Sequence, residues 1–471
     1  MNRRLLIAIA TAMVLVLPAM VLAIGETDGN GTTRSNGGGE ITLWDSEIAF
    51  TAGGPIDGLA FGDADPNHDG IEAVTTSRDS GVYLTKYNNA TSEWETDEIW
   101  TSGGQQLTPA IGDLRTDIDG NEILVVGLSS GSEDVNPGEG TATVLTRDGA
   151  SWTAENVFTT EKLIHGCDIG DLDPTIEGNE GVITTFGHET YQIWYDYENE
   201  EWNSSLIHND TGNVRKAVIA DLIPDHPGNE VVTVSKSGRV NIAYGNHTGN
   251  ATHSNWTNEV IWEGDPLARV CVGDIDPDPG LEIYSGSDTF KVFGYKRQEN
   301  GTWIAQELFE DTDKFRGVWV GDVDPNIDGA ELYAYGYSTK CTQIYGSFST
   351  GWSTRTIFED VARSHGIKIG DLKSDNPGLE IGLVGYSESL TLVYPSDWGA
   401  EIAFQGTAAI DGLAIGEVDP DHDGVEMVSS DRNNEVRITK YLSESDSYSS
   451  ESIWTAGGQQ LTPAIGDLRT D

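Results

Sequence analysis

Oxygen-bearing side chains at alternate positions of a short loop recur along this chain. The first such loop is "GDADPNHDGIE", and its candidate ligands are Asp63, Asp65, Asn67 and Asp69. Oxygens at this spacing in a tight loop converge on one point, and a calcium ion takes six to eight of them. Gly70 follows the last ligand, and a glycine permits the sharp turn that a side chain would block. The loop therefore predicts a calcium site.

Three loops keep the complete ligand set. The predicted calcium ligands are Asp63, Asp65, Asn67 and Asp69 in the first loop, Asp322, Asp324, Asn326 and Asp328 in the sixth, and Glu417, Asp419, Asp421 and Asp423 in the eighth. Other loops carry Arg115, Ile223 or Lys373 at the third position, so we expect little or no metal there. The first acid and the last Glu persist even in those loops. Their alternative role is to cap the turn, as carboxylates that accept backbone N–H groups.

A second set of chemically capable residues lies six positions before the first acid of each loop. These residues are Asp57, Leu107, His165, Arg215, Ala268, Arg316 and His365, and Arg269 follows Ala268 directly. We predict a ligand site made of Asp57, His165, Arg215, Arg269, Arg316 and His365. Within it, His165 and His365 are candidate acid and base catalysts, and Arg215 and Arg316 would neutralise a carboxylate. The alternative is that these residues fill polar positions at a solvated surface and pair with neighbouring acids.

The spacing of the loops shows what must position these residues. Successive first acids lie 50, 58, 50, 53, 48, 49, 46 and 50 residues apart, counted from Asp63 to Asp467. Each unit contains short runs rich in β-branched and aromatic residues, such as "IDGLAFGD", "EAVTTS", "GVYLTKYN" and "WETDEIW", separated by turn residues. A repeat of this length with four strands is typical of a propeller blade. We predict an all-β propeller.

A regularly placed tryptophan supports the repeat. Trp44, Trp94, Trp152, Trp202, Trp256, Trp303, Trp352 and Trp398 each precede, by six residues, another bulky side chain. Two residues six apart in a strand lie on the same face. Because the pair recurs in every unit, we predict that it packs one blade against the next rather than binding a sugar.

An internal copy predicts the number of blades. Residues 47–117 align without a gap to residues 401–471, and 40 of the 71 positions are identical. Seven loops lie within that offset, so we predict a seven-bladed propeller over residues 41–394. Its first strand, residues 41–50, would pair into the last blade and remove the free sheet edge. Residues 395–471 would begin a second propeller, and we expect the sequence to be a fragment because it stops inside a loop.

The N-terminus predicts export. Residues 1–23 combine Arg3 and Arg4, an apolar run and a small residue at Ala23, which is the layout of a signal peptide. A membrane anchor is the alternative, although the run is short and broken by Pro18. Residues 24–40 are Gly-rich and read as a linker. Eight Asn-x-Ser/Thr sequons fit a glycosylated exported protein, and the three cysteines are too few for a disulfide framework.

The net charge of the chain excludes two classes of binding partner. Acids outnumber bases 77 to 27, which gives a net charge of −50. Such a surface repels nucleic acid and anionic lipid. We therefore expect neither as a partner, and no direct insertion into a membrane after signal cleavage.

The loops also carry a family resemblance. "GDADPNHDGIEAV", "GDVDPNIDGAELY" and "GEVDPDHDGVEMV" resemble the calcium-binding loops of FG-GAP propeller repeats, which are integrin-α-like and are also called VCBS repeats. The resemblance covers nearly the whole chain after the N-terminal segment. It implies a propeller with calcium-binding loops, but the family includes adhesins, receptors, lyases and dehydratases, so it does not define one function.

These observations combine into one functional hypothesis. We expect a secreted or cell-surface, calcium-stabilised propeller that binds an extracellular protein or glycan in adhesion, because tandem propellers gain avidity. The alternative is a carbohydrate-active lyase or dehydratase that uses His165, Arg215, Arg316 and His365.

Overall fold

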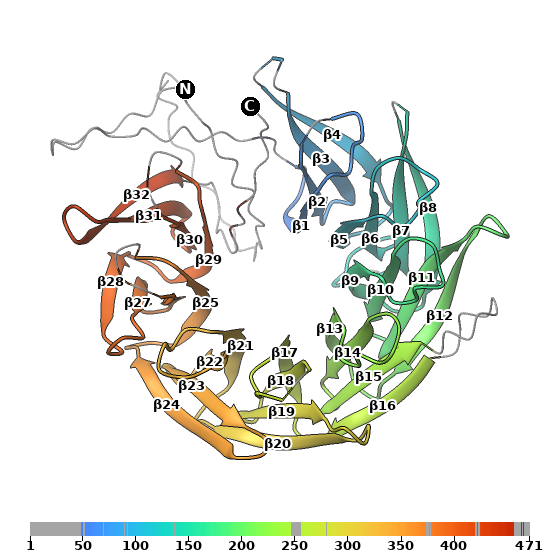
Figure 1. Cartoon of the computed structure of the whole chain (residues 1–471). Helices are drawn as coiled ribbons and strands as arrows, with labels where there is room; N and C mark the ends of the chain where they lie inside the picture. Colours follow the sequence, from blue (N-terminus) through green and yellow to red (C-terminus); the bar gives the residue numbers. More distant parts are fainter. Residues whose placement is uncertain are drawn as a thin grey trace.

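The computed structural model describes residues 52–455, apart from 69, 89, 92, 136, 150, 246–255, 279, 374–375, 377, 420–421 and 423, together with 49, 463 and 465. These residues form eight four-stranded antiparallel sheets and no helix. Figure 1 shows the sheets standing side by side around a common centre, each with its first strand innermost. We call each sheet a blade and number the blades in chain order. Among the described residues, no helix has the length and apolar character needed to span a membrane.

The first four blades occupy residues 56–263. Blade one contains β1 (Ile56–Gly62), β2 (Glu72–Ser77), β3 (Gly81–Asn88) and β4 (Glu93–Thr101). Blade two contains β5 (Gln106–Gly112), β6 (Glu122–Leu128), β7 (Gly140–Asp148) and β8 (Ser151–Thr160). Blade three contains β9 (Ile164–Gly170), β10 (Glu180–Thr185), β11 (Glu189–Asp196) and β12 (Glu201–Asn209). Blade four contains β13 (Val214–Ala220), β14 (Glu230–Ser235), β15 (Arg239–Gly245) and β16 (Trp256–Glu263).

The other four blades occupy residues 267–455. Blade five contains β17 (Leu267–Gly273), β18 (Glu282–Ser287), β19 (Lys291–Arg297) and β20 (Trp303–Glu310). Blade six contains β21 (Phe315–Gly321), β22 (Glu331–Gly336), β23 (Lys340–Ser347) and β24 (Gly351–Glu359). Blade seven contains β25 (Ser364–Gly370), β26 (Glu380–Gly385), β27 (Ser389–Val393) and β28 (Ala400–Gln405). Blade eight contains β29 (Ile410–Gly416), β30 (Glu426–Asp431), β31 (Glu435–Leu442) and β32 (Ser447–Thr455).

The burial of each strand follows its place in the blade. The second strands are buried almost throughout, whereas the fourth strands alternate between exposed and partly buried residues. Both faces of these second strands are buried, which is why "EAVTTS" and "EVVTVS" do not alternate between apolar and polar residues. Blade one follows the four runs predicted from its sequence, so that prediction is confirmed.

A recurring close contact joins the inner strands of neighbouring blades. A Cβ atom added to the glycine that ends an inner strand would lie only 2.6–3.2 Å from an Ile or Val of the next blade. The joined pairs are Gly62–Ile111, Gly112–Ile169, Gly170–Ile219, Gly273–Val320, Gly321–Ile369, Gly370–Ile415 and Gly416–Ile465. Only glycine lets the two backbones approach this closely. Blade four has Ala220 at this place, where the next blade offers the smaller Val272.

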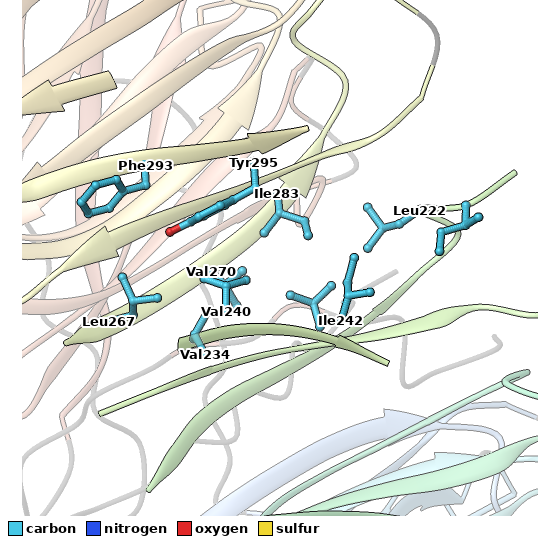
Figure 2. Packing of buried hydrophobic residues seen from close by; sticks show 11 residues of the cluster. Leu222, Val234, Val240, Ile242, Leu267, Val270, Ile283, Phe293 and Tyr295 are labelled. Carbon is cyan, nitrogen blue, oxygen red and sulfur yellow. The ribbon is translucent and has the colours of Figure 1, made fainter. Parts of the chain in front are cut away.

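The hydrophobic core is divided among the contacts between blades. Figure 2 shows one such cluster, in which Val234, Val240 and Ile242 of blade four face Leu267, Val270, Ile283, Phe293 and Tyr295 of blade five. These side chains are buried to 3% exposure or less. No blade buries its faces alone, which is the behaviour expected of a repeat architecture.

The tryptophans of the outer strands pack between blades, as predicted. Trp202 donates its indole N–H to Glu155 of the preceding blade, at 3.0 Å. Trp256 donates to Gln192 at 3.1 Å, and Trp352 donates to Gln306 at 3.1 Å. Each indole therefore covers apolar surface and satisfies its polar group on the neighbouring blade.

The eighth blade continues the same arc. β28, which follows the boundary predicted between residues 394 and 395, pairs with β27 as the fourth strand of the same sheet. β29 contacts β25 just as the other inner strands contact their neighbours. Residues 41–48 and 50, which we predicted to close a seven-bladed ring, lie outside the described residues, as do the signal peptide and linker predicted for 1–40.

Candidate functional site

The acidic loops lie between the first and second strand of each blade. In seven of them, the backbone N–H of the sixth loop residue donates to the carbonyl of the third, as in His68 to Asp65 at 2.8 Å. The glycine that stands two residues before the last Glu has a positive φ in all eight described loops, for example +136° at Gly70. The predicted need for glycine at this turn is confirmed.

The last Glu of every loop caps the turn from within the core. Glu72 Oε2 accepts the backbone N–H groups of Ala64 at 2.7 Å and Asp65 at 2.9 Å. The same two bonds recur at Glu122, Glu180, Glu230, Glu282, Glu331, Glu380 and Glu426. All eight glutamates are at most 1% exposed. The capping role that we gave as the alternative to metal binding is therefore confirmed for this Glu.

Three loops add a histidine to the cap. His68 Nδ1 lies 2.6 Å from Glu72 Oε1, and its Nε2 lies 2.8 Å from the carbonyl oxygen of Tyr87 on β3. His226 and His422 bridge the loop Glu and the third strand of their blades in the same way. These histidines fix the loop against the sheet, and sequence reasoning missed them although the His-x-x-x-Glu spacing was visible.

Burial makes these glutamates hard to ionise. Desolvation raises the pKa of Glu122, Glu230 and Glu282 to about 7, although backbone N–H groups oppose the shift. The pKa of Glu180 rises to about 8 for the same reason. The Oε1 atom of Glu180 is buried without a hydrogen-bond partner among the described residues, so the donors that favour its charged form are the two N–H groups on Oε2.

The free energy of unfolding should therefore fall as the pH rises from about 5 to about 8. A Glu whose folded pKa lies above its unfolded value of 4.5 binds its proton more tightly in the fold. Its contribution is fully present below that unfolded value and is lost as the pH passes the folded pKa. Denaturant unfolding at several pH values measures the slope. The Glu180→Gln variant should flatten it, and an unchanged slope in that variant would contradict the assignment.

A basic side chain binds the second acid in four loops. Lys86 Nζ lies 3.0 Å from Asp65 Oδ2, and Arg147 of blade two lies 3.3 Å from Oδ1. Lys296 pairs with Asp276, Lys440 with Asp419 at 2.9 Å, and Arg355 with Asp324 at 2.6 Å. Burial opposes ionisation of Asp65, but the Lys86 ammonium and the Asn67 N–H hold its pKa below the usual value.

These pairs decide how well the predicted ligands fit a calcium ion. In loop six, the Asp324 carboxylate accepts from Arg355 and from Asn326, while Asp322 and Asp328 are exposed. No group of three acidic, His or Cys side chains suited to a metal occurs among the described residues. Calcium in loop six stays a prediction, and the ion would have to displace Arg355 from the Asp324 carboxylate.

The other predicted calcium ligands are only partly described. Asp63 is exposed, and Asp65 and Asn67 bond to each other at 3.3 Å, while Asp69 lies outside the described residues. In loop eight Glu417 and Asp419 are described, whereas Asp421 and Asp423 are not. Both loops place a lysine of the third strand on the second acid.

The predicted ligand ring is distributed around one end of the inner strands. Asp57 accepts from Arg78 at 2.7 Å and from Gln105 at 3.2 Å. His165 stacks on Phe186 with ring centroids 5.0 Å apart, and His365 Nδ1 lies 2.9 Å from the Asp411 carbonyl oxygen. Each of these three residues thus has a partner in its own or the next blade, although the partner of His165 is a phenyl ring and not an acid.

The remaining ring residues lie on the inner strands of blades four, five and six. Arg269 is exposed on β17. Arg215 and Arg316 hold the second position of β13 and β21, but their side chains lie outside the described part of the structure. Among the described contacts none joins His165 to His365, which belong to blades three and seven, so the structure assembles no acid–base pair from them.

Further along the same inner strands lies a group of exposed and partly buried side chains. We call it the inner-strand cluster, and it consists of Asp168, Lys216, Arg269, Trp319 and Lys368. Blades one, two and eight have Ala60, Ala110 and Ala414 at the position that Asp168, Trp319 and Lys368 occupy in their own blades. The cluster therefore occupies the arc of blades three to seven.

The electrostatics of the inner-strand cluster are cationic. The Lys368 ammonium lies 4.8 Å from the Trp319 ring centroid, and burial lowers the pKa of Lys368. Burial raises the pKa of Asp168, and Lys216 opposes that shift. Trp319 is 41% exposed. Two lysines and an arginine against one aspartate give a local positive charge within a chain of −50.

A pocket lies at the opposite end of the blades, among the acidic loops of blades four to six. It encloses about 620 Å³, and its lining includes Leu281, Lys296, Arg297 and Phe348. Loop five is one residue shorter than its counterparts, and it contributes Asp278 and Gly280 to the lining. This volume lies in the range of small-ligand sites. Sequence reasoning missed the pocket, because the shortened loop was the only sign of it.

Comparison with known proteins gives a fold likeness only. No protein-family model and no curated protein matches the chain. Sqt1 of Chaetomium thermophilum is similar at 13% identity and a TM-score of 0.47, over 70% of this chain and 80% of that one. Sqt1 of Saccharomyces cerevisiae gives 10% and 0.49, over 79% and 95%. The C. thermophilum Sqt1 bound to the N-terminus of the ribosomal protein L10 gives 13% and 0.46, over 77% and 87%.

These matches contradict several predictions. The partner named with a matched structure is a ribosomal protein, not an extracellular protein or glycan. The predicted adhesion function, the secreted or cell-surface localisation with its signal peptide, and the extracellular partner are therefore withdrawn. At 10–13% identity, the likeness does not assign the partner of Sqt1 to this chain either.

Proposed function

We propose that this chain is a binding module that holds an anionic ligand against the inner-strand cluster. One observation carries the proposal: Trp319 and the partly buried Lys368 stand where blades one, two and eight have alanine, and the exposed Lys216 and Arg269 stand where those blades have Gly58, Thr108 and Gly412. A lysine stacked on an exposed indole offers both a charge and an apolar face to a ligand. The predicted residues His165, Arg215, Arg316 and His365 would extend this site at the start of the same strands.

The contrast between the acidic chain and the basic inner-strand cluster supports this proposal. A net charge of −50 repels anions at long range, so basic groups gathered on the inner strands indicate a local purpose. Screening over roughly 8 Å at physiological salt leaves the local charges in control of an anion that has reached them. The lowered pKa of Lys368 fits this purpose, because an incoming anion would stabilise its charged form.

Titration with citrate, a small polycarboxylate, tests the proposal. Citrate should change the fluorescence of Trp319, and the Trp319→Phe variant should lose that change. Lys368→Ala should weaken the affinity about tenfold, as for a charge-assisted bond. Lys291→Ala is the matched control, because Lys291 is a partly exposed lysine on a third strand, away from the inner strands. An equal loss in both lysine variants, or no citrate response in the wild type, would refute the proposal.

We also propose that the chain is an FG-GAP-like propeller with seven blades in residues 41–394 and a second propeller beginning at 395. The internal copy supports this reading, because residues 47–50 and 401–404 are both "EIAF" and suit the same edge of β27. Electron microscopy of the full chain would count the blades in each ring. Calcium at loops one, six and eight stays a prediction, and the ion would have to displace Lys86, Arg355 or Lys440.

A further inference from the structure

A second cationic surface lies at the rim of the ring on blades six to eight. Tyr337 follows β22, Arg363 precedes β25, Tyr386 follows β26 and Arg432 follows β30. Backbone bonds hold these residues at one end of the blades. The N–H groups of Tyr337, Tyr386 and Arg432 donate to the residues that precede the inner strands, Lys314, Arg363 and Ala409, at 2.9–3.0 Å.

Two tyrosine rings lie against the planar guanidinium of Arg363. Its guanidinium carbon lies 3.8 Å from the Tyr386 ring centroid and 4.8 Å from the Tyr337 centroid. Arg363 forms no ion pair with any acid in the part of the chain that the structure describes. A guanidinium stacked on aromatic rings keeps its N–H groups at the edge, where they suit the two oxygens of a carboxylate.

Arg432, the second arginine of this surface, is already neutralised. It donates to both carboxylate oxygens of Asp411, at 2.7 and 3.1 Å, and to the Tyr386 hydroxyl at 2.6 Å. His365 lies against the same Asp411. Arg432 therefore positions the Tyr386 ring, and Arg363 carries the charge that is left for a partner.

The nearest described acid on the connection before β25 is also occupied. Asp360 accepts the Ser387 hydroxyl at 2.7 Å and the Val361 N–H at 2.6 Å. Val361 itself is 91% exposed, which is the highest value among the exposed large hydrophobic residues described. An exposed valine two residues from Arg363 offers an apolar contact beside the charge.

We infer that Val361, Arg363, Tyr337 and Tyr386 form a docking surface for a polypeptide segment that carries a carboxylate next to an apolar side chain. Arginine and tyrosine dominate the binding energy of protein interfaces. A carboxylate suits this surface better than a phosphate, because the field of a −50 chain opposes a doubly charged group more strongly. This surface shares no residue with the inner-strand cluster, so it goes beyond the function proposed above.

Fluorescence anisotropy with a short capped peptide of alternating Glu and Leu tests the inference at physiological salt. We expect saturable binding to the full chain, and about tenfold weaker binding to Arg363→Ala. Lys314→Ala is the matched control, because Lys314 precedes the inner strand of blade six as Arg363 does in blade seven. It should bind within a factor of two of the wild type. Arg363→Lys should bind less well than the wild type, since lysine keeps the charge but loses the planar edge.

Three results would overturn the inference. The first is equal binding of a Gln–Leu peptide, which would remove the role of the carboxylate. The second is equal affinity in the wild type and in an Arg363→Ala variant that denaturant unfolding shows to be folded. The third is stronger competition by inorganic phosphate than by acetate. The citrate titration reads Trp319, so each proposal can fail without the other.

Discussion

Replacing Glu72 with alanine should cost about 3 kcal/mol or more of the free energy of unfolding. The carboxylate accepts two buried backbone N–H groups and lies 2.6 Å from His68. Alanine leaves these donors buried without an acceptor, and each unsatisfied group costs about 1–3 kcal/mol. Denaturant unfolding measures the change. The loss should be larger than that of an ordinary surface change, because no water reaches a residue of 0% exposure.

Two variants serve as controls for Glu72→Ala. Glu72→Gln keeps one acceptor oxygen and should cost less than the alanine. Glu93→Ala changes an exposed glutamate of β4 and should stay within about 0.5 kcal/mol of the wild type. Similar losses for Glu72→Ala and Glu93→Ala would mean that the loop does not depend on this cap.

Replacing Lys296 with methionine should be comparably damaging. Lys296 pairs with Asp276 and Asp278 and lies 3.9 Å from Glu282, and both Asp276 and Glu282 are buried. Removing one partner of a buried pair leaves a charge without compensation, at a cost of about 3–5 kcal/mol. Adding Asp276→Asn to the same chain should recover part of the loss, because the uncompensated charge is then gone.

The matched control lies on the same strand. Lys291 of β19 pairs with the exposed Glu307 at 2.8 Å, and a surface pair contributes at most about 1 kcal/mol. Lys291→Met should therefore be nearly neutral. Measuring the free energy of unfolding of both variants with calcium and with a chelator shows whether lysine or a metal ion neutralises the loop acids. If Lys296→Met were harmless in calcium, a metal ion rather than lysine would neutralise the loop.

Much of the fold could be predicted from the sequence because its signal is repeated. The strand runs of blade one, the glycine turns and the tryptophan contacts each depend on local pattern or on recurrence, and both can be read directly. The boundary at residue 394 could not be placed this way. The copies at residues 47–50 and 401–404 are identical, so the sequence does not say which of them pairs with β27.

The site was predicted less well, because composition alone does not show which side chain neutralises which. Asp65 and Lys86 lie 21 residues apart, as do Asp419 and Lys440, so the constant separation of each acid and its lysine is visible in the sequence. The acids were interpreted as metal ligands, and the cations at this spacing were missed. Asp57 and Arg78 share the same separation. Arg363 was missed because its partners are tyrosines, not acids.

The glycine contacts between inner strands have a consequence for how such a chain can grow. Every such contact uses the same two parts, a glycine at the end of one strand and an Ile or Val on the next. Gly416 meets Ile465 as Gly62 meets Ile111, although these blades are copies placed 354 residues apart. A duplicated blade therefore already carries both the glycine and the Ile or Val that the contacts with its two neighbours require. Gene duplication can lengthen this protein by whole blades without any compensating mutation at the contact between the inner strands.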